Sequence, residues 1–307
     1  MCQPGLPKLM GSLHPAGSLY EKPVNTLDSL NQHINFKRVL AENGVRVMDV
    51  RDVLMLDTDC DVGARVELEE FASQVLKYEM DKSCDSRLIK KEDLFYVGNN
   101  YKRQVLQAMS SDQLVDIIMT NPTVTVTPSL RDTNFTASYS FLPLSNIVFT
   151  RDQQITTCNG IVMANLSSQQ RKNEVDLMKF SFRKLGLRVI GQITDPGRLE
   201  GGDFFPAGKK RLQQIVNSYL LNYPPPPPLF QGEDLCFIGI GLRSNLEAVQ
   251  QLMDNDWMGT RRVAIVDDQF EKNQDRMHLD CVFNILSRDC CVMLEEMMGE
   301  QSHIRRY

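Results

Sequence analysis

The sequence has no long apolar run and no segment typical of an export signal. In Met1–Gly5, at the start of the 307-residue chain, no charged stretch is followed by an apolar one. No later segment approaches the roughly 18 consecutive apolar residues that a membrane-spanning helix needs. We therefore expect a cytoplasmic protein without a membrane partner.

Clusters of cysteine and histidine are lacking as well. The chain has eight cysteines and four histidines, but they are scattered and no CxxC spacing occurs. Disulfide frameworks and zinc sites depend on such clusters, so the sequence indicates neither, and we expect no metal or cofactor. The formal net charge of -5 gives no basic excess for binding nucleic acid.

What the sequence does contain is a recurring order of helix, glycine and strand. Apolar residues at helical spacing predict a helix over Leu27–Asn43, which Gly44 ends before a predicted strand at Val45–Val50. Two later modules repeat this order: a helix capped at Ser167, Gly186 and the strand Leu187–Ile190, then a helix capped at Asn245, Gly259 and the strand Val263–Val266. The repetition favours pseudo-symmetric α/β modules around a shared centre.

Between the first two modules the pattern is helical. Helices are predicted over Val66–Met80, Lys91–Met109 and Ser110–Met119, the last with a capping box from Ser110 and Gln113. The alternating residues Thr123–Thr127 then predict a strand. We expect three parts: the first section of an α/β domain at 1–60, an all-helical insertion at 61–122, and the rest of the α/β domain at 123–307.

One proline-rich segment interrupts the last part. Lys209–Gly232 contains the proline run Pro224–Pro228, which favours an extended helix that cannot join a sheet, so it is predicted to be a disordered insert. Without it, Phe204–Gly208 would lead directly into Glu233–Ile238 as a hairpin. Codons that can encode both ends match intron signals, so we predict a translated intron. A natural proline-rich loop is the alternative.

The stretch Leu199–Phe205 holds two carboxylates, Glu200 and Asp203, on either side of a glycine pair. Glycines permit close approach of another chain segment, and burial or a neighbouring cation would shift the pKa of each carboxylate. Such a pair is suited to acid-base chemistry or to binding a cation. The alternative is an ordinary turn with two solvated acids.

Five short motifs together resemble the arginine deiminases in order and approximate spacing. They are Phe149–Asp152, Arg171–Glu174, Leu199–Asp203, Gly241–Asn245 and Met277–Asp280. The predicted helical insertion is similar to theirs too. The resemblance implies the pentein fold, a five-bladed α/β propeller of ββαβ modules around a polar site, incomplete in this chain.

The resemblance also implies how one end of arginine is bound and attacked. Asp152 and Asp280 would hold the guanidinium group, with Phe149 stacked on it. His278 and Glu200 would move protons while a cysteine thiolate attacks the guanidinium carbon. Ammonia leaves, and water then releases citrulline from the covalent intermediate.

The other end of arginine is a carboxylate, which arginine side chains hold in bidentate fashion. By the same resemblance, Asn146, Arg171 and Arg243 would bind it, and Asp203 would be a further substrate-binding residue. Taken singly, each of these residues could equally be a surface or core residue. Their occurrence in the family's order is what favours the substrate site.

The chain departs from the family at the nucleophile. The family's cysteine lies near the C-terminus, well beyond the motif that contains His278, whereas this chain ends at Tyr307. Cys281 directly follows an aspartate, and Cys290 and Cys291 precede an apolar run that is typical of a core, so none of them fits. The family's first strand is missing as well. We expect a fragment.

Two function hypotheses follow. The first is an arginine deiminase recorded as a fragment, hydrolysing L-arginine in arginine catabolism when complete. The second is a non-catalytic protein that keeps the guanidinium pocket for binding. A related hydrolase acting on agmatine is disfavoured because Arg171 and Arg243 would lack a carboxylate partner. The sequence leaves the oligomeric state open, with a homo-oligomer as one alternative.

Overall fold

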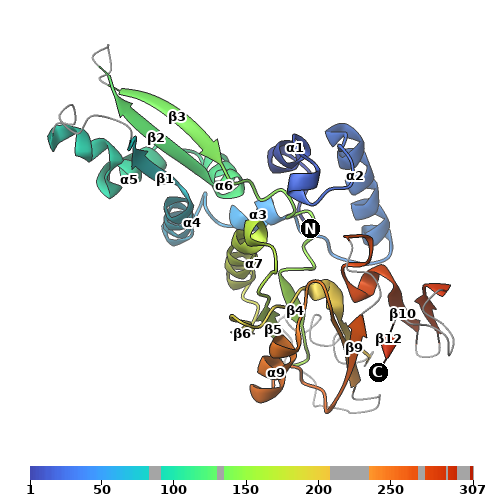
Figure 1. Ribbon diagram of the computed structural model, residues 1–307. Coiled ribbons are helices and arrows are strands. Elements are labelled where there is room, and N and C mark those ends of the chain that lie inside the picture. Colours follow the sequence, from blue (N-terminus) through green and yellow to red (C-terminus); the bar gives the residue numbers. More distant parts are fainter. Residues whose placement is uncertain are drawn as a thin grey trace. The chain divides into compact units, whose positions relative to one another are not determined.

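A computed structural model describes residues 1–82, 91–129, 135–207, 235–268, 274–287, 290–295 and 305–306 (Figure 1). The chain divides into two compact units, 1–148 and 149–307. Within the described ranges, no helix is both long enough and apolar enough to cross a membrane. The predictions for Lys209–Gly232 fall outside the described residues.

The first unit combines helices with one small sheet. Its helices are α1 (Leu6–Ser12), η1 (Ala16–Ser18), α2 (Thr26–Glu42), α3 (Val50–Leu54), α4 (Val62–Val75), η3 (Lys91–Val97), α5 (Asn99–Gln107) and α6 (Ser111–Thr120). The predicted capping box at the start of α6 is confirmed, since Ser110 and Gln113 each bond the other's backbone N–H. Helix α4 packs against α6, and both helices bury apolar residues, among them Leu68 in α4 and Leu114 and Ile118 in α6.

The sheet of the first unit corrects two predictions. Strand β1 (Lys77–Met80) runs parallel to β2 (Pro122–Pro128), which pairs with the antiparallel β3 (Phe135–Phe141). The helix predicted over Val66–Met80 therefore ends at Val75, and the insertion is not all-helical. The strand predicted at Thr123–Thr127 is confirmed.

The strand predicted at Val45–Val50 is wrong. Asp49 accepts a hydrogen bond from the backbone N–H of Arg51 and thereby caps α3, which begins at Val50. Asp49 also accepts from the N–H of Gln3, far away in the sequence. A side-chain cap starts a helix where alternation alone would favour a strand.

The second unit is an α/β arrangement of mixed sheets (Figure 1). One sheet has the order β4-β5-β6, from β4 (Gln154–Thr156), β5 (Ile161–Met163) and β6 (Val189–Gln192). A second has the order β12-β9-β8-β7, from β7 (Phe204–Pro206), β8 (Leu235–Ile240), β9 (Arg262–Asp268) and β12 (Arg305–Arg306). Strands β10 (Phe283–Ser287) and β11 (Cys290–Met293) form a third. The helices are η4 (Gln169–Arg171), α7 (Lys172–Lys184), η5 (Gly201–Asp203), α9 (Leu246–Asp254), η6 (Gln274–Arg276) and η7 (Leu279–Cys281).

Two of the three predicted modules are confirmed in this unit. Helix α7 is followed by Gly186 at φ +66° and then by β6, and α9 is followed by Gly259 at φ +65° and then by β9. Asn245 caps α9 by accepting from the N–H of Ala248. Ser167 is not a cap, because η4 starts after Ser168 and leads into α7. The α/β class is thus confirmed, whereas the five-bladed propeller stays a prediction.

Strands β7 and β8 pair in the antiparallel manner that the sequence predicted for them. The N–H of Ala207 donates to the carbonyl of Leu235 at 2.8 Å, so the described chain ends on both sides of 208–234 already lie together. Both strands contribute to a buried core, which consists of Ile155, Val162, Ile193, Leu199, Phe204, Cys236, Ile238, Ala248, Val249, Leu252 and Met258. This core supports the segment that holds Glu200.

Candidate functional site

The glycine pair between Glu200 and Asp203 is buried in the second unit. A Cβ added to Gly202 would be 2.5 Å from Nδ1 of His278, so only glycine lets the imidazole lie against this backbone. Both carboxylates are buried, with Glu200 fully inaccessible and Asp203 4% exposed. The alternative of two solvated acids in a turn is therefore wrong.

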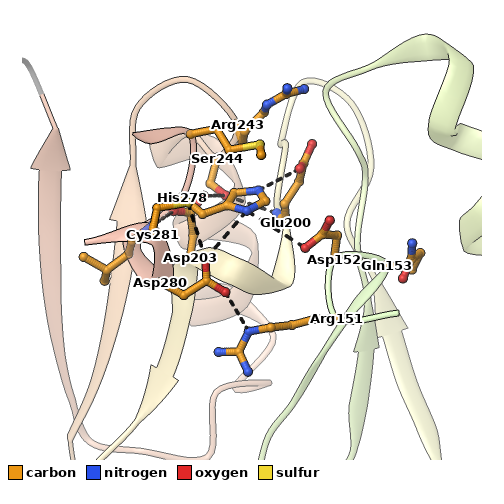
Figure 2. A network of polar contacts seen from close by, with 12 residues as sticks. Arg151, Asp152, Gln153, Glu200, Asp203, Arg243, Ser244, His278, Asp280 and Cys281 are labelled. Carbon is orange, nitrogen blue, oxygen red and sulfur yellow. Dashed lines mark hydrogen bonds and ion pairs between the residues drawn. The ribbon is translucent and has the colours of Figure 1, made fainter. Parts of the chain in front are cut away.

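Glu200 and His278 form a buried pair (Figure 2), with Oε2 of Glu200 2.8 Å from Nε2 of His278. The backbone N–H of Ser167 donates to the other carboxylate oxygen at 3.2 Å. Burial would raise the pKa of Glu200, but the hydrogen bond and charge of His278 and the charge of Arg171 lower it. A proton at this pair therefore favours the imidazole over the carboxylate.

His278 faces two more carboxylates through its other ring nitrogen. Nδ1 lies 4.0 Å from Oδ1 of Asp152 and 3.9 Å from Oδ1 of Asp280. Burial would lower the pKa of His278, but the bond to Glu200 and the charges of Asp152 and Asp203 raise it above its usual value. The structure thus brings together Glu200, His278, Asp152 and Asp280, the residues predicted to be catalytic, and can hold a protonated imidazole among them.

Asp203 lies behind this pair. It accepts from the Ser244 hydroxyl at 2.6 Å and from the N–H of Leu279 at 2.8 Å. Burial raises its pKa to about 6, against the charge of His278 and these two hydrogen bonds, which lower it. These two hydrogen bonds hold Asp203 within the protein, and a contact of Asp203 with the substrate stays a prediction.

Arg171 is buried among carboxylates. Its Nη1 lies 2.9 Å from Oδ2 of Asp152 and 3.8 Å from Oε2 of Glu200, while Nε and Nη2 donate to Oε2 of Glu174 at 3.1 and 2.9 Å. Burial would lower the pKa of Arg171, but Glu174 and Asp152 raise it above the ordinary value. Gln153 also donates to Glu174, at 2.7 Å. A contact of Arg171 with a substrate carboxylate stays a prediction.

Glu174→Gln is expected to destabilise the second unit by about 2–4 kcal/mol, because Arg171 would lose a charged partner in a buried site. Urea denaturation at pH 7 measures this loss through the fluorescence of Trp257, the single tryptophan, which packs against the core of this unit. The control Glu247→Gln changes an exposed side chain in the first turn of α9 and should cost less than about 0.5 kcal/mol. Equal effects of the two changes would contradict the structural role of Glu174.

Asp280 is the most accessible of the central carboxylates. Its side chain is 28% exposed, and its Oδ2 lies 3.1 Å from Nε of Arg151. Phe149, predicted to stack on a guanidinium group, is 52% exposed. Asn146 belongs to the first unit, where it is buried and donates to the carbonyl of Ser18 at 3.0 Å. The substrate contacts of Phe149 and Asn146 stay predictions.

Arg243 is buried, and its Nη2 donates to Oε1 of Gln274 at 2.8 Å. Its Nε is also buried and has no hydrogen-bond partner within the described residues. Burying an unpaired donor is costly, so this atom suits an acceptor from a ligand. Arg243 and Asp280 lie on opposite sides of His278 in Figure 2.

Three supporting residues were missed from the sequence. Ser244 and Glu174 lie inside motifs that were recognised, but the spacing gave no reason to single them out. Gln274 holds Arg243 in place and lies beyond any of those motifs, so no sequence signal could have found it.

Cys281 is the described cysteine nearest in sequence to His278, and its thiol is not activated. Cys281 is exposed, and its Sγ lies 3.9 Å from Oδ1 of Asp280. Burial of part of the side chain and the negative charge of Asp280 raise the pKa of this thiol, although a backbone hydrogen bond lowers it. Cys290 and Cys291 are exposed on β11, so the prediction that they belong to a core is wrong.

Asp152, Glu200 and His278 are the residues that could hold a metal ion, because each offers one ligand atom and these atoms lie within 4.8 Å of one another. The Arg171 guanidinium already contacts both carboxylates, and His278 is bonded to Glu200 and has a raised pKa, so its ring offers no free lone pair for an ion. The donor set is therefore a poor fit for a metal.

Comparisons with known proteins give the family. The model of the arginine deiminase family matches residues 18–213 and 229–307, and the unmatched segment between them lies within the predicted insert. The curated arginine deiminase of Halobacterium salinarum is 28% identical over 192 residues, which are 51% of this chain and 39% of that protein. The enzyme of Streptococcus pyogenes is 21% identical over 284 residues, 89% of this chain and 61% of that protein. The chain thus spans 39–61% of the length of these two relatives.

Two solved structures are also similar. The N-terminal domain of ArgZ, an arginine dihydrolase from the ornithine-ammonia cycle in cyanobacteria, is 18% identical with a TM-score of 0.36, over 55% of this chain and 47% of that one. The DDAH of Pseudomonas aeruginosa, in complex with citrulline, is 17% identical with a TM-score of 0.33, over 69% and 65%. The resemblance stated from the motifs is confirmed by the family match alone, which covers most of the sequence: this chain belongs to the arginine deiminase family.

Proposed function

We propose that this chain carries the guanidinium-binding and proton-transfer residues of a hydrolase that converts L-arginine and water into L-citrulline and ammonia in arginine catabolism. The observation that carries the proposal is the buried pair of Glu200 and His278, which faces the carboxylates of Asp152 and Asp280. Several carboxylates around one imidazole provide a negative site that a guanidinium group can enter.

The two ends of arginine have separate partners in this proposal. The guanidinium group contacts Asp280 and Asp152, with Phe149 over its face. The α-carboxylate accepts from Arg171 and from Arg243, whose buried Nε has no partner among the described residues. Agmatine, which has no carboxylate, would leave Arg243 unpaired, so it is the poorer substrate.

His278 acts as the acid and then as the base. A thiolate attacks the guanidinium carbon, the C–N bond to one terminal nitrogen breaks, and the imidazolium of His278 gives its proton to the departing ammonia. The neutral imidazole then takes a proton from water, whose oxygen attacks the same carbon, and the C–S bond breaks to release citrulline and the thiolate. Glu200 holds His278 and stabilises its charged form throughout.

The thiolate is not assigned to Cys281, because the charge of Asp280 disfavours ionisation there. For the chain as written, binding of arginine without turnover is therefore the second candidate function.

Asp280→Asn tests the proposal in a titration calorimeter. Arginine affinity should fall by about tenfold or more, because a charged hydrogen bond is worth at least about 1.5 kcal/mol. The control Asp254→Asn removes an exposed carboxylate at the end of α9 and should leave the affinity unchanged. Wild-type affinity in the Asp280 variant, or no arginine binding by the wild type, would overturn the proposal.

A further inference from the structure

Ser244 lies in the turn between β8 and α9, and it is only 1% exposed. Its hydroxyl makes two hydrogen bonds of opposite direction. It donates to Oδ2 of Asp203 at 2.6 Å and accepts from the backbone N–H of Glu200 at 3.1 Å. A hydroxyl can donate and accept at the same time, and an apolar side chain of this size can do neither.

The backbone around Ser244 is held in one place. The N–H of Arg198 donates to the Asn245 side chain at 2.7 Å, and the N–H of Asn245 donates back to the carbonyl of Arg198 at 3.0 Å. The carbonyl of Ser244 accepts from the N–H of Gly241 at 2.9 Å. The turn is therefore fixed against the segment that leads into Glu200, and the hydroxyl is preorganised.

The same hydroxyl is connected to both halves of the central pair. On one side it bonds the backbone of Glu200 directly. On the other side it bonds Asp203, whose second oxygen accepts from the N–H of Leu279, the residue after His278. Gly239 provides the space for this carboxylate, since a Cβ there would lie 2.6 Å from Asp203 Oδ1.

We propose that Ser244 is a positioning residue, which fixes the geometry of the pair formed by Glu200 and His278 and keeps Asp203 ionised behind it. The role in arginine hydrolysis rests on the function proposed above, whereas the effect on His278 itself does not.

Loss of the hydroxyl has a definite electrostatic consequence. Asp203 would keep only the Leu279 N–H among its described partners, so its pKa would rise further from about 6 and more of it would be protonated at pH 7. His278 would then lose one of the negative charges that favour its charged form. Among the described residues, the charged groups around His278 and Glu200 are Asp152, Asp203, Asp280, Arg171 and Arg243.

The test is the titration of His278 by NMR in the wild type, Ser244→Ala and Ser181→Ala, with the His278 signal assigned by its absence in His278→Gln. Ser181 is a matched control, because it is also buried and its hydroxyl bonds only the carbonyl of Leu177 in its own helix among the contacts described. The midpoint of His278 should fall in Ser244→Ala and stay at the wild-type value in Ser181→Ala. An unchanged midpoint in folded Ser244→Ala would overturn the inference.

Two further measurements keep the outcomes separate. If Ser244→Ala does not fold, Ser244→Cys fills the volume with a weak donor and should lower the same midpoint, and an unchanged value there counts against the inference. Arginine affinity of the wild type is measured in parallel by calorimetry. A wild type that binds no arginine would overturn the proposed function, while a lowered His278 midpoint would still support the positioning role.

Discussion

Replacing Arg243 with alanine is expected to weaken the binding of L-arginine by about tenfold to a hundredfold and to leave agmatine affinity within about twofold of the wild type. The reason is that a hydrogen-bonded charge pair contributes about 1.5–3 kcal/mol, and only arginine offers the carboxylate that completes it. Arg243 is held by a hydrogen bond to Gln274, and its buried Nε has no partner in the described structure. This Nε can therefore donate a hydrogen bond to a bound anion. Calorimetric titration with both ligands measures the difference.

The matched control for that experiment is Arg188→Ala, which removes an exposed arginine of the second unit. It should leave both affinities unchanged, because surface substitutions away from a site have small effects. Equal losses for arginine and agmatine in Arg243→Ala would place Arg243 outside the carboxylate site.

The chain expressed as written is expected to bind arginine and to form no detectable citrulline. Covalent catalysis needs a thiolate, and a thiol that stays protonated commonly lowers the rate by several orders of magnitude. Cys281, the cysteine beside Asp280, has a raised pKa, so little of it is thiolate at neutral pH. A colorimetric citrulline assay with high enzyme concentration and long incubation checks this.

Citrulline formation that disappears in His278→Ala would contradict this expectation. The variant Cys281→Ser then decides whether Cys281 is responsible: loss of activity in it would mean that this cysteine had been recruited as the nucleophile. Activity that survives in both variants would point to a contaminating enzyme.

The local signals in the sequence predicted the elements that depend on neighbouring residues. The cap at Asn245, the capping box at Ser110 and the helix end at Gly186 each act within a few residues, and the structure confirms all three. One error came from a distant partner. Lys77–Met80 is a strand because it pairs in parallel with β2, and a helical pattern in its own residues could not reveal that partner.

The same distinction holds for the site. The motifs predicted that Glu200 and His278 act together, and the structure places them 2.8 Å apart. The motifs did not predict that Arg171 would contact Asp152, because that contact depends on how two separate segments pack. Supporting contacts of this kind are set by tertiary structure, and sequence spacing carries no record of them.

A crystal structure of this chain with L-arginine bound tests the central claim most directly. We predict guanidinium nitrogen atoms within hydrogen-bond distance of Asp280 and Asp152, close to the pair formed by Glu200 and His278, and an α-carboxylate on Arg243. Arginine bound in the reverse orientation, or bound away from these residues in crystals that contain saturating ligand, would contradict the account.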